Sequence, residues 1–146
     1  MIPDFEATGL LPAGIHHANW AEIVARFGIS SRRTWLLEGL LNALKMLRTA
    51  GCQVVYIDGS FVTAKTDPED YDGLWDAVGV TGVTLDPIMT DFSAGRLKQK
   101  LKYRGEFFPV QAVEDKLGIT FLEFFQICKA SGAPKGIIRL ELSTLP

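Results

Sequence analysis

Cysteine is scarce in this chain, and so are long apolar runs and an excess of either charge. Only Cys52 and Cys128 occur among 146 residues, which excludes a disulfide framework. No apolar stretch approaches the roughly 20 residues that span a bilayer, so we expect no membrane partner. The formal net charge of -2 gives no general attraction to nucleic acid or anionic lipid. Any such binding would need a local patch.

The first residues, Met1 to Glu6, lack the basic and then apolar pattern of a secretory signal peptide. Together with the two isolated cysteines, this predicts a cytoplasmic protein. A chain of 146 residues, 47% of them hydrophobic, is long enough to bury a core and fits one domain over residues 1–146. No linker, repeat or low-complexity tract divides it.

Helical and strand patterns alternate along the chain. Residues 1–17 contain Pro3, Gly9, Pro12 and Gly14 and predict an extended lead-in that lies on the domain. Apolar spacing and caps predict helices over 19–27, from Ser30 or Ser31 to Gly51, over 93–103 and over 120–128. Short apolar runs predict strands over 54–57, 71–78, 83–89, 107–110 and 136–142. The alternation predicts an α/β or α+β class built around one sheet.

Five basic residues follow one another at alternate positions: Arg96, Lys98, Lys100, Lys102 and Arg104. On a helix they would spread around the cylinder, with Leu97 and Leu101 facing inward. This favours a solvated face. The functional alternative is a contact with a triphosphate or a nucleic acid.

A Gly-Ser turn and two closely spaced acids are the residues best suited to chemistry. Gly59 and Ser60 follow the predicted strand 54–57, and Asp70 and Asp72 precede and enter the next one. Side chains at i and i+2 of a strand point to the same side, so we expect both carboxylates to project together. Paired carboxylates offer the hard oxygen ligands that Mg²⁺ requires, and two such ions can support phosphoryl transfer. Gly59 lets a ligand approach the backbone, and amides around Ser60 could hold phosphates.

The stretch from Tyr56 to Trp75 resembles the signature of the DNA polymerase β-type nucleotidyltransferase superfamily, in which an apolar strand, Gly-Ser, a short loop and Asp-x-Asp follow in order. The small size is similar to that of the minimal bacterial and archaeal members. The segments 9–16 and 134–139 look like a small bacterial branch of the group. The resemblance implies a single nucleotidyltransferase-like domain with a mixed sheet flanked by helices.

The resemblance also implies a nucleoside triphosphate as donor and Mg²⁺ as cofactor. By matching position, Gly59 and Ser60 take the phosphate-contact role, and Asp70 and Asp72 the metal-ligand role. One departure is Gly73, which stands where the pattern usually has a bulky apolar residue.

The family uses a third carboxylate on a later strand. Glu106 is our choice for this catalytic and metal-binding role, because it follows a predicted helix and starts a predicted strand. Asp86 and Asp91 are the alternatives. Lys135 lies in a turn before the last strand and does not belong to a P-loop. We therefore interpret it as a turn residue, with a phosphate contact as the functional alternative.

Two functions remain open at this stage. The first is a Mg²⁺-dependent nucleotidyltransferase that moves a nucleoside monophosphate from a triphosphate to a hydroxyl acceptor. The second is a catalytically inactive nucleotide- or protein-binding module, such as an antitoxin-like partner. Because 146 residues leave no room for a separate acceptor-binding domain, we expect the protein or RNA acceptor, or the protein partner, on another chain.

Overall fold

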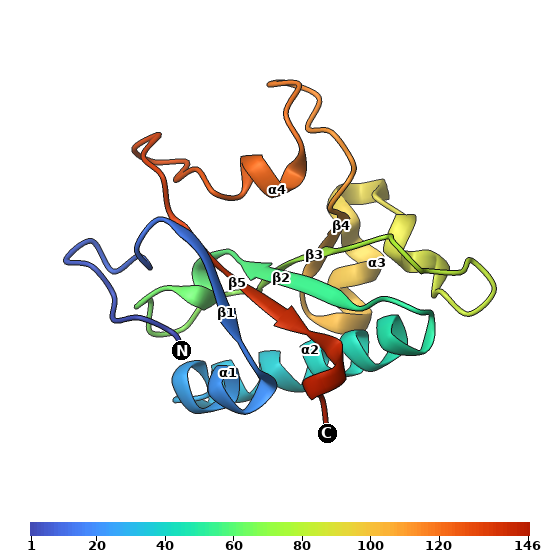
Figure 1. Ribbon diagram of the computed structural model, residues 1–146, viewed down its shortest axis with the longest axis horizontal. Coiled ribbons are helices and arrows are strands. Elements are labelled where there is room, and N and C mark those ends of the chain that lie inside the picture. Colours follow the sequence, from blue (N-terminus) through green and yellow to red (C-terminus); the bar gives the residue numbers. More distant parts are fainter.

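The computed structural model describes residues 1–146 and contains one mixed five-stranded sheet (Figure 1). Its strands are β1 (Gly14–Ala18), β2 (Val54–Asp58), β3 (Asp72–Trp75), β4 (Glu106–Pro109) and β5 (Gly136–Glu141), in the order β1-β5-β2-β3-β4. Strand β1 is parallel to β5, and β3 is parallel to β4, whereas β2 is antiparallel to both of its neighbours. The predicted α+β class with a mixed sheet is confirmed.

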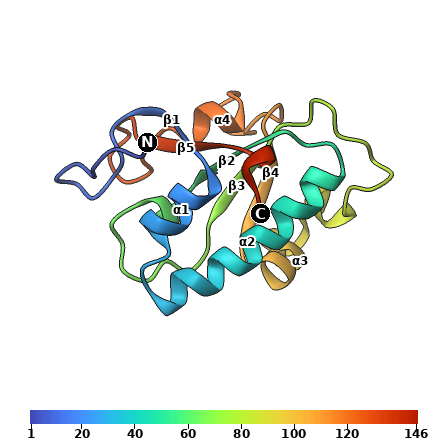
Figure 2. The ribbon, with the colours of Figure 1, turned by 60° about the horizontal axis from the view of Figure 1, so that its bottom comes forward.

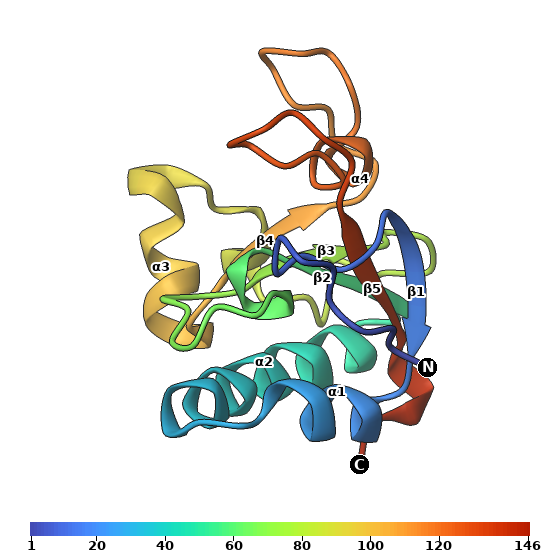
Figure 3. The ribbon, with the colours of Figure 1, turned by 90° about the vertical axis from the view of Figure 1, so that its left-hand side faces the viewer.

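The helices lie on both sides of this sheet. They are α1 (Trp20–Phe27), α2 (Ser31–Thr49), α3 (Ser93–Tyr103) and α4 (Phe121–Phe124), with 3₁₀ turns η1 (Ser60–Val62), η2 (Pro87–Thr90) and η3 (Leu142–Thr144). Helices α1 and α2 cover one face, and α4 with its flanking loops lies over the other (Figures 1 and 3). Helix α3 packs beside β4 and α2. None of these helices is long and apolar enough to cross a membrane.

Local capping fixes the starts of the first two helices. Asn19 accepts a hydrogen bond from the backbone of Glu22, whose carboxylate accepts one from the backbone N–H of Asn19. This reciprocal pair satisfies two amides that would otherwise lack partners. Ser30 caps α2 in the simpler way, through the N–H of Arg33. The predicted helix starts at these two caps are confirmed.

The two faces of the sheet are packed very unequally. A cluster of 26 buried residues joins α1 and α2 to the face that carries Val55 and Ile57. Figure 2 shows α2 running beneath the strands on this side. The opposite face has a cluster of only three buried residues, Leu74, Phe108 and Phe125. Since the second face needs less apolar packing, it has room for polar groups.

Four predicted elements differ in the structure. The helix predicted over 120–128 is only the short α4, Phe121–Phe124. The lead-in 1–17 is not extended coil throughout, because its last residues form β1 beside β5. The strand predicted over 71–78 ends at Trp75, and the strand predicted over 83–89 is absent, with the turn η2 closing that segment. Apolar content alone did not distinguish strand from loop here, because this loop packs Met89 into the core.

The predicted orientation of α3 is also wrong. Leu97 and Leu101 are 48% and 75% exposed, and Gln99 and Tyr103 face the core instead. The cause is a left-handed turn at Ala94, Gly95 and Arg96, whose φ values are 50°, 64° and 63°. The turn breaks the helix near its start and resets its rotation, which no periodicity rule anticipates.

Candidate active site

Three carboxylates stand in one row across the central strands. Asp72 on β3 is the direct register partner of Asp58 on β2 and of Glu106 on β4. Partners across neighbouring strands share a face and lie about 5 Å apart. Phe107, the next residue along β4, points into the large core, so this acidic row (Asp58, Asp72 and Glu106) lies on the thinly packed face.

Asp70 lies close to the row but outside the strand. Strand β3 begins at Asp72, so the expectation that both acids alternate along one strand is wrong for Asp70. Tyr71 between them is fully buried, and its hydroxyl donates to the carbonyl oxygen of Tyr103 at 2.7 Å. Asp70 opens instead onto a separate cavity of about 210 Å³, lined by Trp35, Glu69, Asp70, Lys100 and Arg104.

The centre of the row is electrostatically unfavourable for a negative charge. The pKa of Asp72 is raised to about 7, mainly by burial and also by the charges of Asp58, Glu106 and Asp70. Burial also raises the pKa of Asp58 to about 6, although Lys135 opposes the rise. Adjacent carboxylates that repel one another this strongly favour a proton or a cation between them.

Each end of the row has its own cation. Lys135 Nζ lies 3.2 Å from Asp58 Oδ2, and the side chains of Arg96 and Lys100 lie 2.8 and 2.9 Å from the carboxylate oxygens of Glu106. The structure therefore brings Lys135, which we had interpreted mainly as a turn residue, to the same place as the acids.

The two alternatives for the third acid are engaged elsewhere. Asp86 is bound by Lys102 and the hydroxyl of Tyr103, both at 2.6 Å. Asp91 pairs with Lys98 at 3.1 Å. Neither acid is a register neighbour of Asp72, whereas Glu106 is. Counting the pair between Arg104 and Glu38, all five residues of the basic cluster form ion pairs with acids of this chain.

Two glycines permit the close packing around Asp72. Gly59 has a φ of 84°, and a Cβ at this position would lie 2.8 Å from Asp72 Oδ2. Gly73 leaves room for the ring of Phe107, which a Cβ would approach to 2.6 Å. The departure at Gly73 is thus a packing requirement, since the aromatic ring from β4 takes the space of the missing side chain.

A cavity of about 330 Å³ lies beside the acidic row. Gly59, Ser60, Asp72, Lys129 and Lys135 form its polar part, and the apolar part comes mainly from the segment around α4, with Phe124, Phe125 and Ile127. Its volume is in the range of small-molecule sites, which combine apolar walls with a few polar groups. The structure thus brings Gly59, Ser60, Asp72 and Lys135 into one cavity and leaves Asp70 at another.

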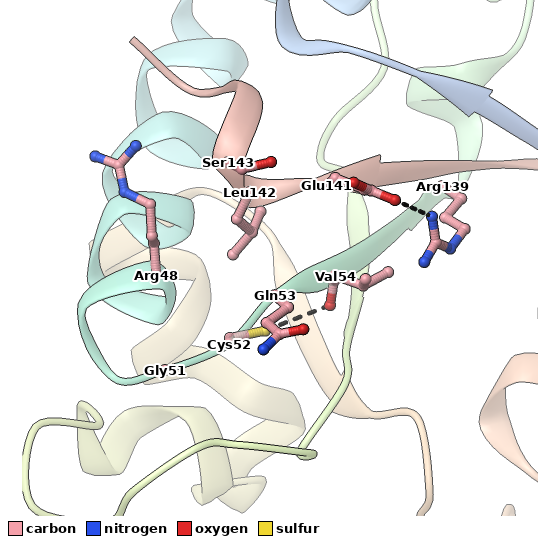
Figure 4. Close-up of a pocket in the computed structure, with 9 residues that line it drawn as sticks. All are labelled: Arg48, Gly51, Cys52, Gln53, Val54, Arg139, Glu141, Leu142 and Ser143. Carbon is pink, nitrogen blue, oxygen red and sulfur yellow. Dashed lines mark hydrogen bonds and ion pairs between the residues drawn. The ribbon is translucent and has the colours of Figure 1, made fainter.

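A larger cavity of about 430 Å³ lies at the other end of the sheet (Figure 4). Arg48, Gln53, Arg139 and Glu141 are among its lining residues, and Arg139 pairs with Glu141 at 2.8 Å. Val54, at the opposite end of β2 from Asp58, lies in its wall. None of the residues singled out by the sequence lines it.

The carboxylate oxygens near the cavity are the kind of ligand that Mg²⁺ prefers, but their placement does not form a complete metal site. No group of three or more His, Cys, Asp or Glu side chains is placed so that it could hold a metal ion. Mg²⁺ is commonly held by one or two carboxylates, with waters and substrate phosphates as its other ligands. Asp72 lines the cavity and can supply one carboxylate, so the residues fit the ion on the condition that phosphate or water completes the coordination.

Comparison with known proteins assigns the chain to a family. A family described as "Family of unknown function (DUF6932)" matches residues 3–141. The chain belongs to DUF6932. No curated protein and no solved structure matches it. The stretch shared with DUF6932 contains the acidic row, the Gly59-Ser60 turn and Lys135, so the candidate site lies wholly within the part of the chain that defines the family.

Sequence reasoning missed two polar residues of this DUF6932 site, Asp58 and Lys129. Asp58 was passed over as the end of the strand before Gly59, although it is fully buried in the structure. A signal was present, because a charged residue directly after four apolar strand residues is rarely buried without a reason. Its register with Asp72, however, depends on strand pairing that the local pattern does not give.

Proposed function

We propose that this DUF6932 chain is a Mg²⁺-dependent, nucleotidyltransferase-like protein that moves a nucleoside monophosphate from a nucleoside triphosphate to a hydroxyl acceptor. The observation that carries the proposal is the acidic row beside the Gly59-Ser60 turn, whose central residue Asp72 lines a cavity of about 330 Å³. Backbone atoms, acids and lysines of this kind are what a triphosphate and its counter-ions require.

The residues of the cavity divide naturally between the parts of a nucleotide. Gly59 and Ser60 would contact the phosphates through the backbone, and Lys129 and Lys135 would neutralise part of their charge. The apolar wall of Phe124, Phe125 and Ile127 would take the base and sugar. Asp72, the acid that lines the cavity, would hold the ion together with water and phosphate oxygens, and the ion neutralises developing charge on the phosphoryl oxygens when bound.

In this reaction the acceptor oxygen forms a bond to the α-phosphorus, and the bond from that phosphorus to the bridging oxygen breaks. Pyrophosphate leaves, and the proton of the acceptor hydroxyl passes to a carboxylate or to water. Such transfer depends on positioning and charge neutralisation rather than on covalent catalysis. Asp70, at its separate cavity, is suited to receive an acceptor from another chain, a protein or an RNA.

A cytoplasmic location is part of the proposal. Cys52 and Cys128 are both free thiols, which is the usual state in a reducing compartment.

The first test is thermal unfolding with ATP, GTP, CTP and UTP, each with and without Mg²⁺. Ligand at a hundredfold excess over its dissociation constant stabilises the native state by about 2.7 kcal/mol. We expect a Mg²⁺-dependent rise in Tm with at least one nucleotide, and its loss in Asp70→Asn/Asp72→Asn. Once a donor is known, full transfer activity in Asp70→Asn would refute the proposed mechanism.

One observation favours the inactive alternative, a nucleotide- or protein-binding module. Glu106 is held by two cations, and no three acids converge as metal ligands. A partner-binding module would form a stable complex that survives Asp70→Asn/Asp72→Asn. Pull-down with the wild type and this double variant separates the two functions, because loss of the complex in the variant would count against the module.

A further inference from the structure

The carboxylate of Asp58 is the least satisfied polar group near the site. The residue is 0% exposed, and neither of its side-chain oxygens has a hydrogen-bond partner. Buried carboxylates almost always accept hydrogen bonds, because an unpaired buried charge is costly. Its cross-strand neighbour is Asp72, another acid, which makes the local need for positive charge larger.

Lys135 meets this need only in part. Its ammonium group lies 3.2 Å from Asp58 Oδ2 and forms the one ion pair that Asp58 makes. The geometry is that of an ion pair without a hydrogen bond, so Oδ1 is left with no partner at all. Lys135 also lines the cavity that Asp72 lines, which places a single positive charge between Asp58 and that cavity.

We propose that Asp58 and Asp72 form a divalent-cation site and that, in the ligand-free chain, the ammonium group of Lys135 occupies the place of the ion. The site is distinct from the Asp70 and Asp72 pair that the Asp-x-Asp pattern indicates, because its two carboxylates come from different strands. The inference rests on the proposed function only for the choice of Mg²⁺ as the natural ion.

The arrangement makes cation binding and anion binding reinforce each other. A polyphosphate in the cavity would attract Lys135 away from Asp58, since Lys135 lines that cavity and also contacts Asp58. Departure of the lysine leaves two adjacent carboxylates free for a divalent ion, and the ion in turn favours the phosphate. By linkage each ligand must raise the affinity of the other by the same factor. Lys135 then acts as an internal competitor of the metal.

The test measures binding of Mn²⁺ alone, by the loss of its free electron paramagnetic resonance signal, with no nucleotide present. Lys135→Gln removes the competing charge, and we expect it to bind Mn²⁺ at least about tenfold more tightly than the wild type, a change of about 1.4 kcal/mol. Asp58→Asn and Asp72→Asn should each weaken binding at least about tenfold. Lys45→Gln is the charge-matched control, because Lys45 is an exposed residue that forms no ion pair and does not line this cavity.

Equal Mn²⁺ affinity in the wild type and folded Lys135→Gln overturns the proposal, and so does equal tightening in Lys45→Gln. If Lys135→Gln does not fold, as judged by circular dichroism, the comparison of wild type with Asp58→Asn decides. Binding lost in Asp58→Asn supports the site, and binding retained refutes it. Because no nucleotide is used, a failed Tm shift with all four triphosphates would refute the proposed transferase and leave this result standing.

Discussion

Asp58 and Asp72 are direct partners across β2 and β3, two acids placed opposite each other with a single lysine at one end of the pair. Like charges opposite each other in a sheet destabilise it. The fold therefore carries an electrostatic cost at this position. The cost makes several properties of the protein measurable without knowledge of its substrate.

The raised pKa values of Asp58 and Asp72 determine how the stability of the protein depends on pH. The pKa of Asp58 is raised to about 6 and that of Asp72 to about 7, from 3.8 in the unfolded chain. Between these limits the native state binds more protons than the unfolded state, so the free energy of unfolding should fall as the pH rises from about 4 to about 7. The acids with lowered pKa, Asp86 and Asp91, act below this window.

Asp72→Asn should flatten this pH dependence and raise the free energy of unfolding at pH 8 by roughly 2–4 kcal/mol, since one pKa unit corresponds to about 1.4 kcal/mol. Urea unfolding of both proteins at pH 5 and pH 8 measures the difference. A wild-type stability that rises between these pH values, unchanged by the substitution, would contradict the electrostatic description of the row.

Gly59→Ala should destabilise the protein by about 1–3 kcal/mol. The residue has a φ of 84°, and its new Cβ would press against Asp72, so conformational strain and a steric clash add together. Gly82→Ala is the matched control, since no heavy atom lies within 4 Å of a Cβ there. Equal stability of the two variants in chemical denaturation would show that the backbone at Gly59 is not constrained.

Arg33→Met should lower the free energy of unfolding by about 3 kcal/mol and loosen the loop after Gly59-Ser60. The guanidinium group of Arg33, only 2% exposed, donates to the carbonyl oxygens of Phe61, Thr63 and Lys65. A hydrogen bond from a charged donor contributes about 1.5–3 kcal/mol to stability. Hydrogen exchange of residues 60–66 should become faster, whereas Arg48→Met, which removes one 3.5 Å contact, should leave it unchanged.

Tyr71→Phe should lower stability by about 1–2 kcal/mol, because it leaves the buried carbonyl oxygen of Tyr103 without its donor. The side chain points into the large core, away from the acidic row. Mn²⁺ affinity should therefore be that of the wild type. A clear change in affinity would mean that the two faces of β3 are coupled through the backbone.

The sequence predicted correctly those features of the fold that depend on interactions between residues close in the chain. The caps at Asn19 and Ser30, the buried strand at Val55 and Ile57, and the break at Gly59 all depend on residues close in the chain. The predicted inward orientation of Leu97 and Leu101 was wrong because the local apolar pattern did not reveal the backbone conformation before it. A three-residue left-handed turn reset the helix, and only Gly95 among those residues gives any hint of it.

The site itself was predictable only in part. Gly59, Ser60 and Asp72 were identified from their spacing, but the places of Asp58, Glu106 and Lys135 depend on register between distant strands. Glu106 joins Asp72 because β4 is parallel to β3, and Lys135 reaches Asp58 because β5 lies next to β2. These contacts span more than thirty residues, a separation at which sequence pattern carries no geometric information.

The position of β5 has a consequence for biosynthesis. This strand is synthesised after the other four, yet it lies between β1 and β2, so its Ile138 and Leu140 join the large core only after those strands have been made. Until then β1 has no hydrogen-bonding neighbour in the sheet, and β2 has an open edge. Such late, long-range pairing slows folding and exposes nascent chains to aggregation. We therefore expect the nascent chain to stay prone to aggregation until synthesis passes Glu141, where β5 ends.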